Sequence, residues 1–122
     1  MPGTAKRVKW ANWARAPGVW RGMIEGRQLR TGVTVLFYET DTVGEGPAPH
    51  VHDYDEVFII REGRAMFTIG GREILAETGD VIFGPAQVPH SFRNLGPGRL
   101  ETTDIHLSDR FAQVSLTDPE DD

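Results

Sequence analysis

The stretch HVHDYDE, residues 50–56, places two of the chain's four histidines one residue apart and a glutamate shortly after them. Imidazole nitrogens and carboxylate oxygens together suit divalent transition metals such as Fe, Mn, Co, Ni, Cu and Zn. A single histidine on a strand is more often a packed or surface residue than a ligand. Burying His50, His52 and Glu56 together without a partner would cost roughly several kcal/mol, however, so the pattern favours a metal site.

The spacing of these residues also predicts the path of the chain. On a strand, His50 and His52 point to the same face, and Glu56 has the same parity. Four extended residues cover roughly 13 Å, whereas a bond from a metal to nitrogen or oxygen is only about 2 Å long. Glu56 can therefore share a metal with His52 only if the chain folds back between them. We expect a turn at 53–55, where aspartate side chains can accept hydrogen bonds from nearby backbone N–H groups.

Short strands between turn signals make up most of the chain that must position these residues. Runs rich in β-branched and aromatic residues, bounded by glycine or proline, occupy 18–26, 32–40, 56–63, 65–75, 78–85 and 100–108. Gly70-Gly71 predicts a hairpin within the fourth run. Helical spacing is confined to a turn or two within 8–16. With fourteen glycines and eight prolines, the pattern predicts an all-β sandwich or small barrel.

Composition narrows the classes of partner. The 122 residues are enough for one hydrophobic core, and 39% hydrophobic and 25% charged residues are ordinary for a globular protein. A net charge of −5, with one short basic run at 5–9, argues against nucleic acid. No apolar run approaches the roughly 20 residues of a membrane span, and no secretory signal is evident, so we expect a cytoplasmic protein. The absence of cysteine excludes disulfides and thiolate ligands.

A longer pattern surrounds the two histidines. GEGPAPHVHDYDEVFIIREG, residues 44–63, has the form G-x5-H-x-H-x3-E-x6-G. GDVIFGPAQVPHSFRN, residues 79–94, has the form G-x5-P-x-G-x2-H-x3-N, except that Gln87 replaces a glycine. The two motifs resemble the two-part signature of the cupin family, in particular its small single-domain members. Because glycine would allow a positive φ, Gln87 predicts a slightly different turn before His90, or a polar side chain hanging near the site.

The resemblance implies a double-stranded β-helix, also called a jelly-roll barrel, that holds one divalent transition metal per chain. Carried over residue by residue, the metal ligands are His50, His52, Glu56 and His90. The alternative is a metal-free barrel that keeps these side chains as a polar network.

The same resemblance suggests a layout for the whole chain. We expect one domain over 1–122, with the barrel at about 18–109, an N-terminal arm at 1–17 and an acidic tail at 117–122. Trp10, Trp13 and Trp20 are expected to pack this arm. Because small barrels usually cover their exposed edge strands with a partner, we expect a homodimer.

Other inward-facing side chains would form a pocket beside the metal. Phe58 and Ile60 share the parity of Glu56, and Phe92 shares that of His90. His106 is a candidate acid or base, since its strand has one inward face, although that face could instead meet solvent or a partner chain. Tyr38 is a second candidate, with a partly buried, hydrogen-bonded tyrosine as the alternative.

The expected function is that of a mononuclear metalloenzyme acting on a small polar molecule, of dioxygenase, isomerase or lyase type. A non-catalytic binding or sensing module, in which the metal anchors the ligand, is the alternative. In a third possibility the metal only stiffens the barrel. The fold does not decide among these functions.

Overall fold

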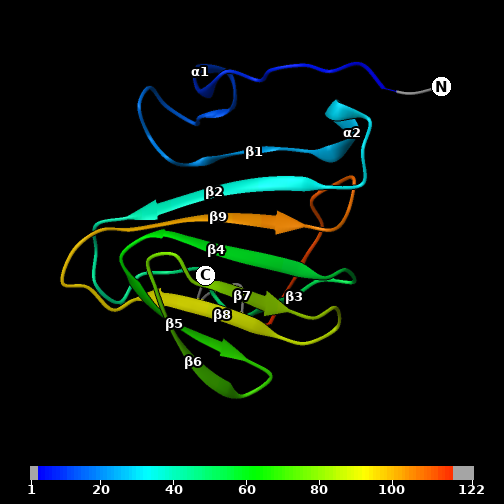
Figure 1. Cartoon of the computed structure of the whole chain (residues 1–122). Helices are drawn as coiled ribbons and strands as arrows, with labels where there is room; N and C mark the ends of the chain where they lie inside the picture. The colour runs from blue at the N-terminus through cyan, green and yellow to red at the C-terminus, as the bar shows by residue number, and fades with distance from the viewer. Residues whose placement is uncertain (1–2, 117–122) are drawn as a thin grey trace.

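The computed structural model describes residues 3–116, so the acidic tail expected at 117–122 lies outside the described residues (Figure 1). Two four-residue helices, α1 (Trp10–Trp13) and α2 (Gly26–Leu29), lie near the start of the chain. The strands described are β1 (Gly22–Ile24), β2 (Thr34–Thr40), β3 (His50–Val51), β4 (Glu56–Glu62), β5 (Arg64–Ile69), β6 (Arg72–Glu77), β7 (Val81–Gly84), β8 (His90–Asn94), β9 (Leu100–His106) and β10 (Val114–Ser115).

These strands form two five-stranded sheets. One has the order β1-β2-β9-β4-β7 and the other the order β10-β3-β8-β5-β6. All pairings are antiparallel, and most neighbours in a sheet are distant in sequence. Figure 1 shows the first sheet running from β1 down to β4 and the second lying below it. The arrangement is a jelly-roll β-sandwich, which confirms the all-β jelly-roll prediction.

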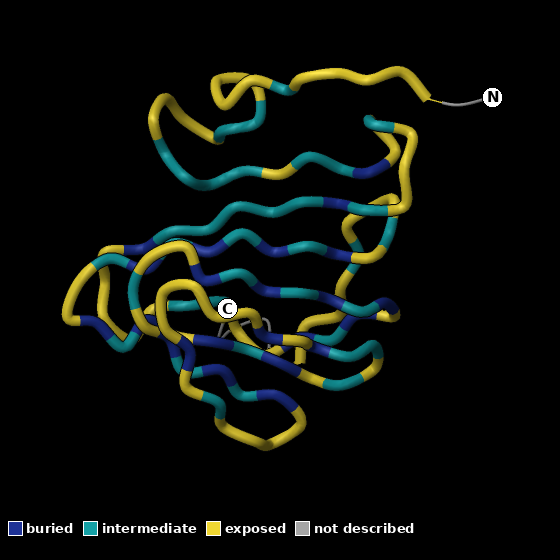
Figure 2. Tube along the Cα trace, in the orientation of Figure 1, coloured by how far each residue is buried: buried dark blue, intermediate teal, exposed yellow. Residues whose placement is uncertain are grey.

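The core lies between the two sheets because side chains alternate across each strand. Along β4, Glu56, Phe58 and Ile60 are buried, and the residues between them are less so. Figure 2 shows the same alternation along β9, where every second residue is buried. Phe58 and Phe67 are 1% and 0% exposed, and burying one such ring stabilises the fold by about 1.5–3 kcal/mol. Two inward positions are polar where these strands pair: Glu56 at the start of β4 and His106 at the end of β9.

The predicted strands are found with local differences. β5 and β6 form the expected hairpin, and Gly70 and Gly71 have φ of 57° and 80°, the positive values of a type I′ turn. The run at 18–26 yields only the short β1, because Glu25 and Gln28 make a capping box that begins α2 at Gly26. The two-residue β10 follows β9, and a strand so short leaves no periodic signal in the sequence.

The N-terminal arm packs on the chain's own sheet. Trp13 stacks on Phe37 of β2 with ring centroids 3.6 Å apart. Trp20 meets the same ring edge-on at 5.2 Å and donates a hydrogen bond from Nε1 to the carbonyl of Thr102 at 3.1 Å. α1 corresponds to the helical turn expected within 8–16. The arm thus covers β2 on the outer face of the first sheet, the face that points away from the second sheet.

The part of that outer face near β7 is apolar and partly exposed. Val57 of β4 pairs with Phe83 of β7 on one side and with Ile105 of β9 on the other. Phe83 is 54% and its neighbour Val81 is 63% exposed. Such a face is typical of surfaces that contact other proteins. The homodimer expected from the sequence stays a prediction.

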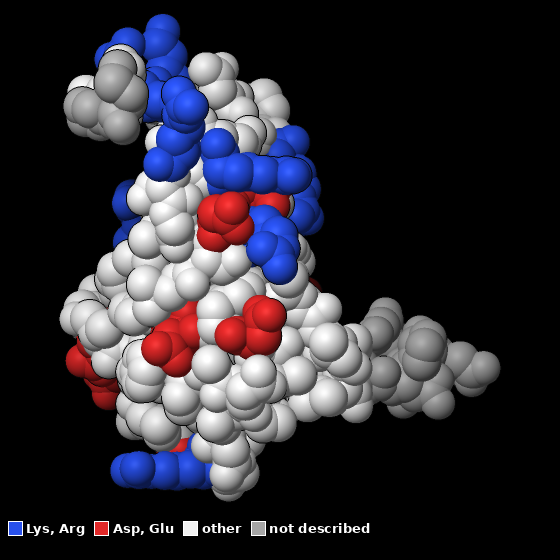
Figure 3. Space-filling view, turned by 90° about the vertical axis from the view of Figure 1, so that its right-hand side faces the viewer, with Lys and Arg blue, Asp and Glu red and all other residues white. Residues whose placement is uncertain are grey.

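Charged side chains are distributed unevenly on the face shown in Figure 3. Basic side chains gather at its upper end, near the N-terminal segment, with acidic ones among and below them. Ion pairs among the described residues include Arg27 with Glu25 at 2.9 Å and Arg110 with Asp109 at 3.5 Å. Within residues 3–116, no helix has the length and apolar character that crossing a membrane requires.

Candidate metal centre

The HVHDYDE segment crosses from one sheet to the other. β3 belongs to the second sheet and β4 to the first, so the chain reverses at residues 52–55 and brings Glu56 back toward the histidines. Glu56 Oε1 lies 3.1 Å from His52 Nε2, which confirms that the chain folds back there.

The turn is held by distant partners, not by the local aspartate bonds that we expected. Asp55 Oδ1 accepts a hydrogen bond from the N–H of Ala86 at 2.8 Å, and these residues are 31 positions apart. The hydroxyl oxygen of Tyr54 accepts a hydrogen bond from the N–H of Ala112 at 3.2 Å. Asp53, by contrast, is exposed. The turn therefore depends on the loop before β8 and on the segment leading into β10.

Four side chains converge inside this end of the sandwich. His50 pairs with His90 across β3 and β8, and His90 Nε2 lies 3.2 Å from Glu56 Oε1. One ligand atom each from His50, His52, Glu56 and His90 lies within 4.8 Å of the others, and all four residues are buried. The structure thus brings together all four residues that the motif resemblance implied, in a group that could hold a metal ion.

Two backbone carbonyls orient the first pair of imidazoles. His50 Nδ1 lies 2.7 Å from the carbonyl oxygen of Ala48, and His52 Nδ1 lies 2.7 Å from that of Ala112. A carbonyl oxygen only accepts, so each Nδ1 carries a proton and donates it. In a neutral ring the lone pair is then on Nε2. Hydrogen bonds of this kind commonly orient histidines that bind metals.

The remaining polar atoms of the group form no hydrogen bond. His52 Nε2, Glu56 Oε1 and both ring nitrogens of His90 are buried, and none makes a hydrogen bond. Leaving one such atom unsatisfied costs about 1–3 kcal/mol. His52 Nε2 and His90 Nε2 lie 3.1 and 3.2 Å from Glu56 Oε1 without forming a hydrogen bond with it, whereas a divalent cation would accept the lone pairs of several of these atoms at once. The donor set therefore fits a metal better than it fits a closed network.

The protonation states of the ligand group also suit a cation. Burial lowers the pKa of His50 to about 4, so its ring is neutral near pH 7. Burial alone would raise the pKa of Glu56, but contacts with the imidazoles of His106, His52 and His90 outweigh it and hold this pKa below its ordinary value. The group thus offers a carboxylate and a neutral imidazole without first having to lose a proton from either.

The turn before His90 differs from our expectation. Gln87 itself adopts a left-handed backbone with φ of 67°, so the glycine-like turn is kept and the prediction of a different turn is wrong. This conformation costs a non-glycine residue about 1–2 kcal/mol. The N–H of Gln87 donates to the carbonyl of His52 at 2.8 Å, which ties the loop to the ligand turn. The side chain of Gln87 is exposed.

A cavity of about 300 Å³ adjoins the ligand group. Its lining includes His50, Glu56, Phe58, Phe92, Tyr38, Leu36, Asp104, His106, Phe111, Arg15 and Arg21. The ring of Tyr38 meets that of Phe92 edge-on at 5.5 Å. Phe58 and Phe92, which we expected beside the metal, both line this cavity. Ile60 does not line the cavity, because it lies farther along β4 and packs in the core.

His106 faces inward and contacts the ligand group. It is 2% exposed, and its Nε2 lies 3.1 Å from Glu56 Oε2. Because a carboxylate only accepts, Nε2 carries the proton of that contact. His106 Nδ1 lies 2.7 Å from the hydroxyl of Tyr54. His106 therefore holds the oxygen of Glu56 that does not face His52 and His90, and Tyr54 fixes the imidazole from behind.

Asp104 is a polar group of the cavity that we did not single out as a site residue. It is 6% exposed, and its Oδ1 makes no hydrogen bond. Burial, with the nearby charge of Glu56, raises the pKa of Asp104 well above its usual range. The available signal was its alternation with His106 along residues 100–108, which places both side chains on one face.

Replacing Asp104 by asparagine should change how stability depends on pH. In unfolded chains an aspartate titrates near pH 3.9, whereas folded Asp104 keeps its proton to higher pH, so a rise in pH favours unfolding between these two values. In metal-free protein, rising pH should lower the free energy of unfolding by up to about 1.4 kcal/mol per pH unit in this range. Urea unfolding between pH 5 and 8, with chelator present, should show a smaller loss of stability with rising pH for Asp104→Asn than for the original chain. Asp53→Asn, at an exposed position, is the control, and equal slopes for all three proteins would contradict the assignment.

Comparison with known proteins identifies related folds. A family model described as a cupin domain matches residues 37–106. A variant of oxalate decarboxylase from Bacillus subtilis has a TM-score of 0.70 and 19% sequence identity over 78% of this chain. Another structure of that enzyme, described with Mn(II) centres, has a TM-score of 0.71 and 22% identity over the same share. No curated protein sequence matches the chain significantly.

The likeness to these enzymes concerns the fold alone, since identity is 19% and 22%. This chain also spans only 27% of the length of either enzyme. The family match, in contrast, covers more than half of this chain and includes all four residues of the ligand group.

Proposed function

The chain belongs to the cupin family, and on that premise we propose that it is a mononuclear metalloenzyme acting on a small polar molecule. One divalent transition metal, drawn from Fe, Mn, Ni, Co, Cu and Zn, is held by His50, His52, Glu56 and His90. The observation that carries the proposal is the set of buried, unpartnered ligand atoms beside a cavity that His50 and Glu56 also line.

The metal, when bound, supplies a Lewis acid that polarises an oxygen of the substrate. The residues of the chain orient the metal ligands and shape the cavity. Ala48 and Ala112 orient the rings of His50 and His52 through their carbonyls. Phe58 and Phe92 give the cavity apolar walls, which exclude bulk water and strengthen electrostatic interactions inside.

His106 and Asp104 are the groups that could hold or move a proton beside the substrate. Both line the cavity without belonging to the ligand group. Such groups are what an isomerase or lyase needs in addition to a metal, and they favour an enzyme over a purely structural metal site. Tyr38 also lines the cavity, but its contact with Phe92 gives it a role in the wall.

A ligand screen followed by a turnover assay tests the proposal. Small carboxylates, enediols and sugar acids are screened by thermal shift, and each ligand found is incubated with every candidate metal, with and without O₂, and followed by mass spectrometry. We expect a metal-dependent product. Glu56→Gln should leave the fold intact and lower turnover at least tenfold, since it changes the charge of the ligand group with little change in volume. Glu73→Gln, at an exposed position on β6, should have no effect.

A ligand that binds tightly but stays unchanged with every metal would contradict the enzyme assignment for that ligand. It would support instead the alternative of a cupin that binds or senses a small molecule.

A further inference from the structure

The cavity extends along β2 and β9, away from the ligand group. Thr34 and Glu56 both pair with His106, Leu36 pairs with Asp104, and Tyr38 pairs with Thr102. Tyr38 is therefore four residues from the level of Glu56, or roughly 13 Å along the strand. Both Tyr38 and Glu56 line the cavity, so it connects two levels of the sandwich.

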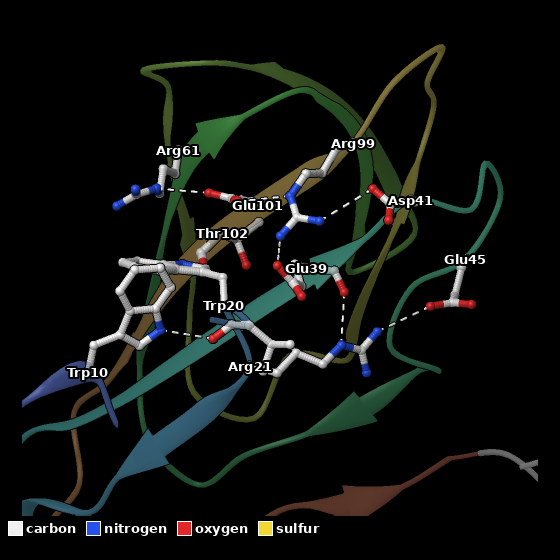
Figure 4. Close-up of polar contacts among 11 residues, drawn as sticks. Trp10, Trp20, Arg21, Glu39, Asp41, Glu45, Arg61, Arg99, Glu101 and Thr102 are labelled. Atoms are coloured by element: carbon white, nitrogen blue, oxygen red, sulfur yellow. Dashed lines mark hydrogen bonds and ion pairs between the residues drawn. The ribbon is translucent and has the colours of Figure 1, made fainter. Parts of the chain in front are cut away.

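Arg21 lies at the Tyr38 level of this cavity. The guanidinium carbon of Arg21 is 4.7 Å from the centroid of the Tyr38 ring. Its Nε donates to the carbonyl of Glu39 at 2.9 Å, and one Nη donates to Glu45 Oε1 at 3.2 Å. Figure 4 shows the side chain held between these partners. A guanidinium has five N–H donors, so Arg21 is held in place and still has donors to offer a ligand.

A second guanidinium lines the same cavity. The side chain of Arg15 makes no hydrogen bond or ion pair within residues 3–116, and its positive charge is therefore uncompensated there. The backbone N–H of Arg15 donates to the carbonyl of Arg21 at 2.7 Å, and Ala14 pairs with Gly22. The arm fits closely at this point, because a Cβ on Gly22 would lie 2.0 Å from the carbonyl oxygen of Trp13. The fold thus joins the two arginines through their backbones, and both residues line the cavity.

The walls between the two levels are mainly apolar. They are formed by Leu36, Phe58, Phe92, Met23 and Phe111. A volume of about 300 Å³ is at the small end of ligand pockets, which suits a metabolite and not a polymer. The exception among the walls is Asp104, which offers one unpartnered oxygen.

We propose that the cavity binds a small, elongated diacid. One end of the ligand, a carboxylate with an adjacent oxygen, lies at the ligand group, an apolar chain crosses the middle, and a second carboxylate lies on Arg15 and Arg21. This inference rests on the proposed function, because the first end requires the metal. Guanidinium groups recognise carboxylates through paired N–H donors, and partial burial strengthens such contacts relative to open water.

A matched pair of acids tests this inference. 2-Oxoheptanedioate and 2-oxoheptanoate share the same chelating end and chain length, and differ in a terminal carboxylate against a methyl group. Their affinities for the metal-loaded protein are measured by isothermal titration calorimetry. We expect the diacid to bind at least tenfold more tightly than the monoacid.

Variants of the two arginines test whether they bind the second carboxylate. Arg15→Gln and Arg21→Gln should each reduce the preference for the diacid severalfold and leave affinity for the monoacid unchanged. Arg15→Gln is the safer variant, because its side chain has no intramolecular partner to lose, whereas Arg21→Gln also removes contacts with Glu39 and Glu45. Arg72→Gln, exposed on β6 and outside the cavity, is the matched control.

The outcomes separate this inference from the proposed function. Protein that takes up no metal would refute the proposed function, and the diacid with it. Metal-loaded protein that binds the two acids equally, or binds neither, overturns the diacid inference and leaves the metal site standing. A preference for the diacid that survives in both Arg15→Gln and Arg21→Gln would also overturn it, since the second carboxylate would then be held elsewhere.

Discussion

A variant carrying both His50→Ala and His52→Ala should purify with almost no divalent transition metal, whereas the original chain should contain close to one per chain. The double change removes two of the three imidazoles in the ligand group. It leaves His90 and Glu56, too few ligands to hold a metal through purification. Elemental analysis of protein purified without chelator measures the difference.

Two controls accompany this measurement. Asp53→Ala changes an exposed residue of the same turn and should keep full occupancy. His106→Gln removes a residue that contacts Glu56 but lies outside the ligand group. Loss of such a supporting contact typically weakens metal binding by about 10–100-fold. The metal site of the His106→Gln variant should therefore still be fully occupied at high metal concentration. Full occupancy surviving in the double variant would exclude the proposed ligands.

Metal binding should also stabilise the folded chain strongly. The ligand group is assembled only in the folded state, so a metal at 100 times its dissociation constant adds about 2.7 kcal/mol to the free energy of unfolding. For a chain of this size each kcal/mol raises the midpoint of thermal unfolding by roughly 3–6 °C, so the midpoint should rise by roughly 8–16 °C. The unpartnered atoms of His52, Glu56 and His90 are the groups whose burial the metal compensates.

Differential scanning calorimetry of chelator-treated protein, titrated with each metal, measures this effect. The double histidine variant should show no shift at the same metal concentrations. A midpoint that is independent of metal in the original chain would mean that folded and unfolded chains bind metal equally, and would contradict a site built by the fold.

Much of this centre could be predicted from local sequence. The distance between His52 and Glu56 along an extended strand was enough to require a reversal between them, and the reversal is there. The identity of His90 as a further member of the group came from the motif resemblance, because its 38-residue separation from His52 carries no local signal. The inward face of β4 followed from alternation alone, whereas for β9 alternation put His106 and Asp104 on one face and left open whether that face points inward.

Other features depend on contacts that one sequence does not reveal. Asp55 bonds Ala86, and Ala112 accepts from His52, across separations of 31 and 60 residues. Arg15 and Arg21 reach the cavity because the N-terminal arm folds against β2, and nothing in their spacing points inward. At Gln87 the surrounding loop imposes the left-handed backbone that the residue type disfavours, so tertiary structure overrides local preference there.

In the proposed site, one metal at the inner end of the cavity is held by His50, His52, Glu56 and His90. The most direct measurement is anomalous diffraction from crystals of metal-loaded protein, collected at the absorption edge of the metal found by elemental analysis. We expect a single strong anomalous peak about 2.0–2.2 Å from a ring nitrogen of each histidine and from a carboxylate oxygen of Glu56. A fully loaded crystal whose peak lies elsewhere, or contacts fewer than three of these residues, would contradict the proposed site.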